Sequence, residues 1–268
     1  MSASGGTKAV LAALIANLSI AVLKFLAYLL TQSSSMLAES IHSVADSGNQ
    51  VLLLLGGKAA QRQASPKHPF GYGRERYIYS FIVAIVLFSV GGLFALYEAY
   101  HKWHDPHGIH EWQWVPVTVL IGAIVLESFS FRTAIQETNR VRGDQGWVRF
   151  IRTSRAPELP VILLEDFAAL VGLVLALFGV SMTLVTDNGL WDAAGTAGIG
   201  VLLVAVAVVL AIETKSLLLG ESATREHVER IENAITAGGT AIIHLRTLHI
   251  GPDELLVAAK IDVPADAS

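Results

Sequence analysis

The sequence predicts an all-α membrane protein with six transmembrane helices, both chain ends in the cytoplasm, and a small α+β cytoplasmic domain. Three observations support this prediction. Only 16% of the 268 residues are charged, against about 25% in ordinary soluble domains. Long apolar runs alternate with short charged segments, and 53% of the chain is hydrophobic. Basic residues also gather in alternate connections, which orients the helices.

Six apolar segments have about the 20 residues that a bilayer core requires. They are predicted at 8–31, 36–60, 76–101, 113–138, 159–185 and 191–214. Five basic residues lie around the second-to-third connection and five around the fourth-to-fifth, whereas the opposite connections hold a single lysine. Because cytoplasmic loops carry the excess of Lys and Arg, both termini are expected in the cytoplasm. We expect a multi-pass protein of the cell (inner) membrane.

After residue 214 the pattern changes to that of a small soluble unit. The stretch "ATREHVERIENAITAG" is typical of an amphipathic surface helix that a glycine ends. Two strands, "TAIIHLRTLHIG" and "DELLVAAKIDV", follow and are joined by "GPDE". The expected organisation is a transmembrane domain at 1–214 and a cytoplasmic domain at 215–268, which we expect to be partial, with α-β-β order.

Composition limits the function classes. The net charge of −4 leaves no basic surface, so we expect no nucleic-acid partner. The chain has no cysteine, which excludes disulfides and thiolate metal sites, so histidine, carboxylate or carbonyl groups must hold any metal. The first apolar run is too long for the hydrophobic part of a signal peptide, so we expect it to remain as a helix.

The second segment carries a polar stripe. At ~100° per residue, Glu39, His42, Asp46 and Asn49 fall within about 80° of one another. The opposite side of the helix is formed by Ile41, Val44, Ala45 and Gly48. Lipid cannot solvate such a stripe, so it must face the bundle interior or a water-filled path.

This stripe suits a metal ion. His42 and Asp46 lie one turn apart, and imidazole with carboxylate binds Zn²⁺ and also Fe²⁺, Co²⁺, Ni²⁺ or Mn²⁺. The fifth segment offers Glu165 and Asp166, which point ~100° apart, so a regular helix directs only one of them at a given centre. The other acid, Asn49 or water would complete the shell. The alternatives are a His–Asp hydrogen bond that only ties helices together, and a salt bridge from the acidic pair to Lys24 or an arginine.

Three further features are less informative about function. Glu98 and Glu127 are either proton relays or partners of a neighbouring helix. Lys24, near the end of the first segment, is expected to extend outward to the membrane surface. The outer loop "HKWHDPHGIHEW" either captures metal or is a hydrated loop with incidental histidines.

These motifs together resemble the cation diffusion facilitator family. The resemblance rests on "SSSMLAESIHSVADSGNQ" in the second segment, "HPFGYGRERY" before the third and "LLLGESA" after the sixth. It implies that a divalent metal, usually zinc, binds between the second and fifth helices. It also implies a homodimer, exchange of metal for protons by alternating access, and a cytoplasmic domain with a ferredoxin-like fold.

The fifth segment departs from the family pattern of His-x-x-x-Asp. Asp166 matches the aspartate, but Ile162 occupies the histidine position. The wording "LLEDFAA" resembles a divergent branch that includes mitochondrial and nuclear-associated animal zinc transporters. In that comparison Glu165 replaces the missing histidine, and an oxygen-rich site discriminates less against Mn²⁺ and Fe²⁺. Glu39 and Asn49 are expected to mark the access path or to act as auxiliary ligands.

The sequence therefore predicts a divalent metal efflux transporter, with Zn²⁺/H⁺ antiport as the favoured activity. Its expected partners are metal ions, protons, lipid and a second copy of the chain. The alternatives are an Fe²⁺ or Mn²⁺ carrier of the same architecture and a membrane metal sensor that does not transport. The sequence contains no His-Glu-x-x-His motif, and we do not expect an enzyme.

Overall fold

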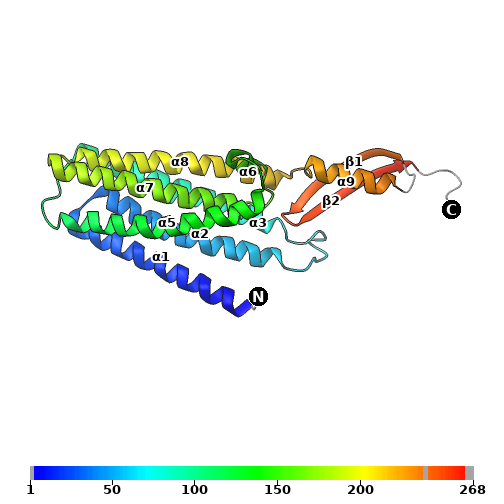
Figure 1. Cartoon of the computed structure of the whole chain (residues 1–268), viewed down its shortest axis with the longest axis horizontal. Coiled ribbons are helices and arrows are strands. Elements are labelled where there is room, and N and C mark those ends of the chain that lie inside the picture. Colours follow the sequence, from blue (N-terminus) through cyan, green and yellow to red (C-terminus); the bar gives the residue numbers. More distant parts are fainter. Residues whose placement is uncertain (1–2, 238–240, 263–268) are drawn as a thin grey trace.

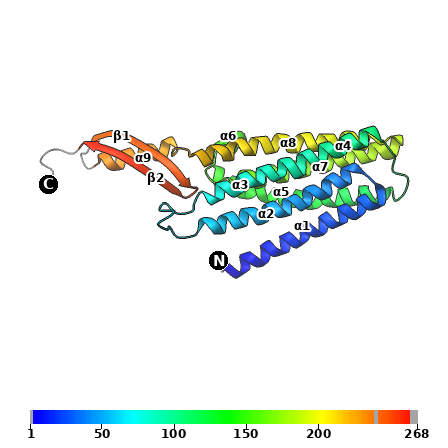
Figure 2. The same cartoon turned by 180° about the vertical axis from the view of Figure 1, so that it is seen from behind.

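Helices dominate the structure, a computed structural model that describes residues 3–237 and 241–262, with side chains from residue 17 onward. In this part of the chain, six long helical rods lie side by side, and a β-hairpin with a short helix extends from one end (Figures 1 and 2). The rods are α1 (Ala3–Thr31), α2 (Ser34–Ala60), α3 (Glu75–Val86) continued by η1 (Leu87–Leu93) and α4 (Phe94–His104), α5 (Trp114–Arg142), α7 (Glu158–Thr186) and α8 (Leu190–Leu219).

Four of the rods are long and apolar enough to cross a membrane, counted over the described residues. They are Glu75–His104, Trp114–Arg142, Glu158–Thr186 and Leu190–Leu219, with mean hydropathy between 1.8 and 2.6. The polar stripe lowers the hydropathy of α2, and the described apolar part of α1 is limited to Asn17–Thr31. Every predicted segment corresponds to one rod, and the beginning of α1 lies at the same end of the bundle as the hairpin (Figure 1).

The third rod contains an unpredicted π-helical segment, Leu87–Leu93. Two adjacent glycines, Gly91 and Gly92, lie in this segment and allow α8 to approach closely. A methyl group on Gly92 would stand 2.7 Å from Cγ2 and 3.1 Å from the backbone nitrogen of Val204. Such π-helical turns are uncommon and are frequent at functional sites. This one lies against α2 at the level of the polar stripe, because a methyl on Gly91 would be 3.9 Å from His42 Nδ1.

A buried carboxylate closes the outer end of the bundle, which is the end opposite the hairpin, whereas the inner end is the one that carries the hairpin. Asp192 in the first turn of α8 accepts hydrogen bonds from the backbone N–H groups of Ser34 (2.7 Å) and Ser35 (3.1 Å) and from the hydroxyl of Ser33 (3.0 Å). These donors form the N-terminus of α2, whose first N–H groups have no partner within the helix. A negative charge at a helix N-terminus is favourable. Asp192 of α8 therefore caps the neighbouring helix α2 and holds the two helices together.

The inner end of the bundle is joined to the hairpin by charged groups. Arg76 at the start of α3 forms ion pairs with Glu158 of α7 and with Asp253 in the hairpin turn. Arg155, which follows the short helix α6 (Trp147–Thr153), pairs with Glu221. A cavity of about 600 Å³ lies here between the inner ends of α2 and α7 and the hairpin turn.

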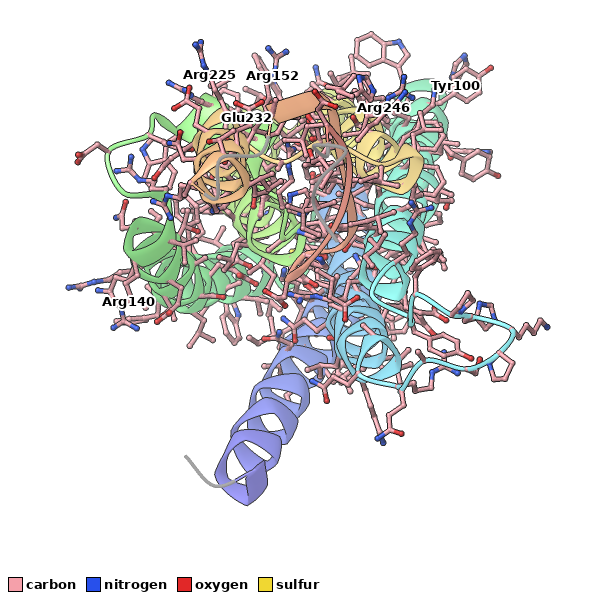
Figure 3. The ribbon with its side chains drawn as sticks, turned by 90° about the vertical axis from the view of Figure 1, so that its right-hand side faces the viewer. Tyr100, Arg140, Arg152, Arg225, Glu232 and Arg246 are labelled. Carbon is pink, nitrogen blue, oxygen red and sulfur yellow. The ribbon has the colours of Figure 1, made fainter. Side chains whose placement is uncertain are left out.

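The C-terminal unit contains the predicted helix and two strands. α9 (Arg225–Thr236) begins after Thr224, whose hydroxyl accepts from the His227 N–H. β1 (Ala241–Gly251) and β2 (Glu254–Asp262) pair antiparallel from Ala241 opposite Asp262 to Gly251 opposite Glu254. Figure 3 looks along the bundle from this end and shows the labelled Arg140, Arg152, Arg225 and Arg246 at the periphery.

Candidate metal site

The polar stripe of α2 is buried against neighbouring helices. Glu39, His42 and Asn49 are at most 1% exposed, whereas Val44 on the opposite side is 53% exposed. The packing partners of this helix include α1, α3 with η1, α7 and α8. The polar stripe therefore faces protein as predicted, whereas the predicted opposite side is only partly exposed, because Ala45 is buried as well.

His42 and Asp46 face each other across one helical turn. His42 Nδ1 lies 3.3 Å from Asp46 Oδ1. Neither ring nitrogen of His42 has a hydrogen-bond partner among the described residues, and Asp46 Oδ1 also lacks one there. Within the described chain, both ring nitrogens of His42 and one carboxylate oxygen of Asp46 are therefore left without a hydrogen-bond partner on the same side of the helix.

Helix α7 directs Glu165 at the stripe. Glu165 is 4% exposed, and its Oε1 accepts a hydrogen bond of 2.7 Å from Asn49 Nδ2. The carboxyl groups of Glu165 and Asp46 lie within hydrogen-bonding reach of each other. The structure therefore brings His42, Asp46, Asn49 and Glu165 together between α2 and α7.

Asp166 points away from this group, toward α5. Its Oδ2 accepts a hydrogen bond of 2.9 Å from the hydroxyl of Ser130. The geometric expectation that only one of the two adjacent acids faces the stripe is confirmed, and that acid is Glu165. Glu127 of α5 interacts electrostatically with Asp46, Glu165 and Asp166, so a third helix adds a carboxyl group beside the site.

The prediction that Lys24 extends outward is wrong. Lys24 is 1% exposed, and its ammonium group donates to Glu39 Oε2 (2.9 Å) and Ser43 Oγ (2.8 Å) inside the bundle. A buried carboxylate provides a partner that the membrane surface would otherwise supply, so the lysine side chain turns inward. Glu39 is consequently half of an ion pair in this arrangement and is not directed at His42.

The outer loop does not gather its histidines. His104 and His107 bond the backbone carbonyls of Tyr100 and Asp105, and His110 Nδ1 lies 3.7 Å from Asp187 Oδ1. The His110 and Asp187 side chains are 70% and 72% exposed. This geometry agrees with the interpretation of a hydrated loop.

The comparison with known families identifies the family to which the chain belongs. The family profile of the cation efflux transmembrane domain matches residues 10–219, which include every helix that contributes to the α2–α7 group. The chain belongs to the cation diffusion facilitator family. This is a family of transporters, not of enzymes, and its members are integral multi-pass membrane proteins.

Several curated relatives of this cation diffusion facilitator are similar over most of its length. It is 32% identical over 262 residues to the mouse proton-coupled zinc antiporter SLC30A9, mitochondrial, a match that covers 96% of this chain and 46% of the relative. It is 28% identical over 261 residues to metal tolerance protein C4 of Arabidopsis thaliana, covering 95% and 56%. A shorter match, 30% over 106 residues, covers 40% of the chain and 33% of the zinc transporter ZitB of Pectobacterium atrosepticum. The chain spans about half the length of the first two relatives.

The candidate ligands of this facilitator do not converge on a single metal position in the described residues. In residues 17–237 and 241–262, no group of three or more His, Asp or Glu side chains has the spacing that would hold a metal ion. The available donors are one imidazole and two carboxylates, from His42, Asp46 and Glu165. Nitrogen with carboxylate oxygen is a donor set that Zn²⁺ accepts and that Mn²⁺ and Fe²⁺ also accept.

Sequence reasoning misplaced one neighbour of this group and missed another. The misplaced one is Lys24, which is expected to point outward or to pair with the two adjacent acids of α7 and instead pairs with Glu39. The other is Ser130, which lies in α5 and accounts for the direction of Asp166. No sequence pattern points to that contact, because a serine in an apolar helix commonly bonds its own backbone.

Proposed function

We propose that the protein is a divalent metal efflux transporter, a Zn²⁺/H⁺ antiporter that works by alternating access with the metal held between α2 and α7. One observation carries the proposal. Eleven buried side-chain nitrogen and oxygen atoms lack a hydrogen-bond partner in the described chain, and five of them belong to Glu39, His42, Asp46 and Asn49. An unpaired buried polar atom costs about 1–3 kcal/mol. A helix that keeps five together within three turns is prepared for a ligand.

Each residue of the group has a role in this proposal. His42, Asp46 and Glu165 are the metal ligands, and Asn49 holds Glu165 toward α2 through its amide hydrogen bond. Asp166 is the candidate fourth ligand when its bond to Ser130 opens, and water is the alternative. Zn²⁺ in catalytic or transient sites commonly takes three protein ligands and one exchangeable position.

Proton coupling follows from the chemistry of these ligands. Metal binds to neutral imidazole and ionised carboxylates, so metal and protons compete for the same groups. Opening the site alternately to the two sides then links metal leaving the cytoplasm to protons entering. The relative named a proton-coupled zinc antiporter supports this coupling. In the proposal all six rods span the cell (inner) membrane, two copies form a homodimer, and the C-terminal unit is part of a cytoplasmic ferredoxin-like domain.

The choice of metal has a specific second candidate. Only one of the three proposed ligands is a nitrogen donor, since Ile162 cannot ligate. Oxygen-rich sites bind Mn²⁺ and Fe²⁺ readily. Competition of each ion with Zn²⁺ in a transport assay separates the two carriers, because the transported ion reduces zinc flux at lower concentration than the others.

The test is flux through the purified chain in liposomes with an imposed pH gradient. We expect wild-type protein to move Zn²⁺, and His42→Ala and Asp46→Ala to abolish that movement. Gly48→Ala is the control, because it lies on the same helix and a methyl there meets nothing within 4 Å. Wild-type flux in both site variants would contradict the assignment, and zinc binding without flux would indicate a sensor.

A further inference from the structure

A buried cation lies beside the proposed metal site and has no place in the ligand set. Lys24 of α1 is 1% exposed, and its ammonium group contacts two groups of α2, Glu39 Oε2 at 2.9 Å and Ser43 Oγ at 2.8 Å. These two residues lie three positions before and one position after His42 in the same helix. A full positive charge is therefore fixed within one turn of a residue that we propose binds metal.

The ammonium group acts on the site electrostatically. Ser43 lines a small cavity of about 10 Å³ together with Asn17, Ile20, Asp46 and Glu127. Lys24 is the cation whose charge acts on Asp46, on Glu127 and on His42. In a medium of low dielectric constant, a charge within one helical turn of a binding site changes the affinity of that site for an ion by roughly tenfold or more.

Glu39 is held out of the ligand set from two sides. Its Oε2 is bonded to Lys24, and its Oε1 points at α7, where a methyl group on Gly172 would stand only 2.8 Å away. The glycine leaves room for the carboxylate between α1 and α7, and the lysine holds it there. Without Lys24, Glu39 would be an unpaired carboxylate one turn from His42.

We propose that Lys24 is a resident cation of the transport site, which neutralises Glu39 so that Glu39 adds no negative charge beside the ligand carboxylates. The negative charge that attracts the metal then comes from Asp46 and Glu165 with the neighbouring Glu127 and Asp166, and the Lys24–Glu39 pair adds none. This inference rests on the proposed function. It assigns Lys24 and Glu39 as positioning residues that set affinity and ion preference without contacting the metal.

The test is binding of Zn²⁺ alone and of Mn²⁺ alone to the full chain in detergent, measured by calorimetry. Removing the negative charge with Glu39→Gln leaves Lys24 unpaired, and we expect binding to weaken by roughly tenfold. Removing the positive charge with Lys24→Gln keeps a donor for Glu39 and Ser43, and we expect binding to tighten by a similar factor. The double variant is expected to return to within about threefold of wild type. Lys58→Gln, the same substitution at the exposed inner end of α2, is the control.

The inference is supported if Glu39→Gln weakens metal binding and Lys24→Gln tightens it. It is overturned if the two substitutions change the affinity in the same direction. A purely structural ion pair would weaken binding in both, with the double variant no better. If Lys24→Gln does not fold, the double variant decides the question, because adding Lys24→Gln to Glu39→Gln must then restore affinity. Absence of metal binding in wild type, or binding unaffected by Asp46→Asn, would overturn the proposed function together with this inference. If Asp46→Asn abolishes metal binding but Glu39→Gln and Lys24→Gln change the affinity in the same direction, the inference alone is overturned.

Discussion

Asp192 gives the strongest prediction on stability, through the substitution Asp192→Asn. Its buried carboxylate accepts four hydrogen bonds from Ser33, Ser34 and Ser35, two of them from backbone N–H groups and two from hydroxyls. The amide retains one good acceptor but loses the charge and presents an N–H₂ group to the α2 N-terminus. Hydrogen bonds to charged groups contribute about 1.5–3 kcal/mol each, so we expect a loss of about 3 kcal/mol.

Thermal unfolding of the detergent-solubilised protein measures this loss. With about 2–4 °C per kcal/mol for a chain of this size, Asp192→Asn should lower Tm by about 6–12 °C. Asp187→Asn is a matched control at the same end of the bundle. Asp187 has an exposed side chain and φ 52°, which asparagine tolerates, and its ion pair with His110 is worth at most about 1 kcal/mol. Equal melting of the two variants would refute the capping role.

Three further predictions concern the site, the hairpin and the π-helical segment. Glu165→Gln should weaken Zn²⁺ binding by at least about tenfold more than Asp166→Asn, measured by calorimetry, since only Glu165 faces α2; equal effects would contradict that. Burial lowers the pKa of His249 below 6.5. As the pH falls, His249 therefore becomes protonated at a higher pH when the hairpin has separated from the bundle than when it is packed in place. Stability of β1, measured by amide exchange corrected for intrinsic rate, should fall as pH drops below 6.5, by at most about 1.4 kcal/mol per unit, and His249→Phe should remove this dependence. Gly92→Ala should cost about 1–3 kcal/mol because a methyl meets the backbone of α8 within 3.1 Å, whereas Gly48→Ala should cost nothing in the same thermal assay.

The positions of the long helices follow from hydropathy, and the inner ends of α2, α3 and α7 agree with the prediction within one residue, but those of α5 and α8 do not. The predicted fourth segment, 113–138, matches α5 at its outer end, but the helix continues to Arg142. The sixth behaves alike, since 191–214 was predicted and α8 ends at Leu219. Apolar windows detect where a chain is in lipid, and a helix does not stop where it leaves the membrane. The π-helical segment was missed because its hydrogen-bond pattern depends on packing against α8.

The composition of the site was predictable, but the directions of its side chains were not. Helical periodicity places His42 above Asp46 and separates Glu165 from Asp166, yet it cannot say which acid faces α2. That choice depends on the rotation of α7, which packing against α5 and α8 determines. Lys24 was misjudged for a related reason: a long side chain reaches either way, and the buried Glu39 that attracts it lies on another helix.

The most direct test of the account is zinc-edge anomalous scattering from crystals of the metal-loaded protein. The account predicts one strong peak between α2 and α7, with His42 nitrogen and oxygens of Asp46 and Glu165 at about 2.0–2.2 Å. It also predicts that Glu39 remains on Lys24 in that structure. A zinc ion bound elsewhere, for example at the outer loop, with His42 and Asp46 still unliganded, would contradict the account.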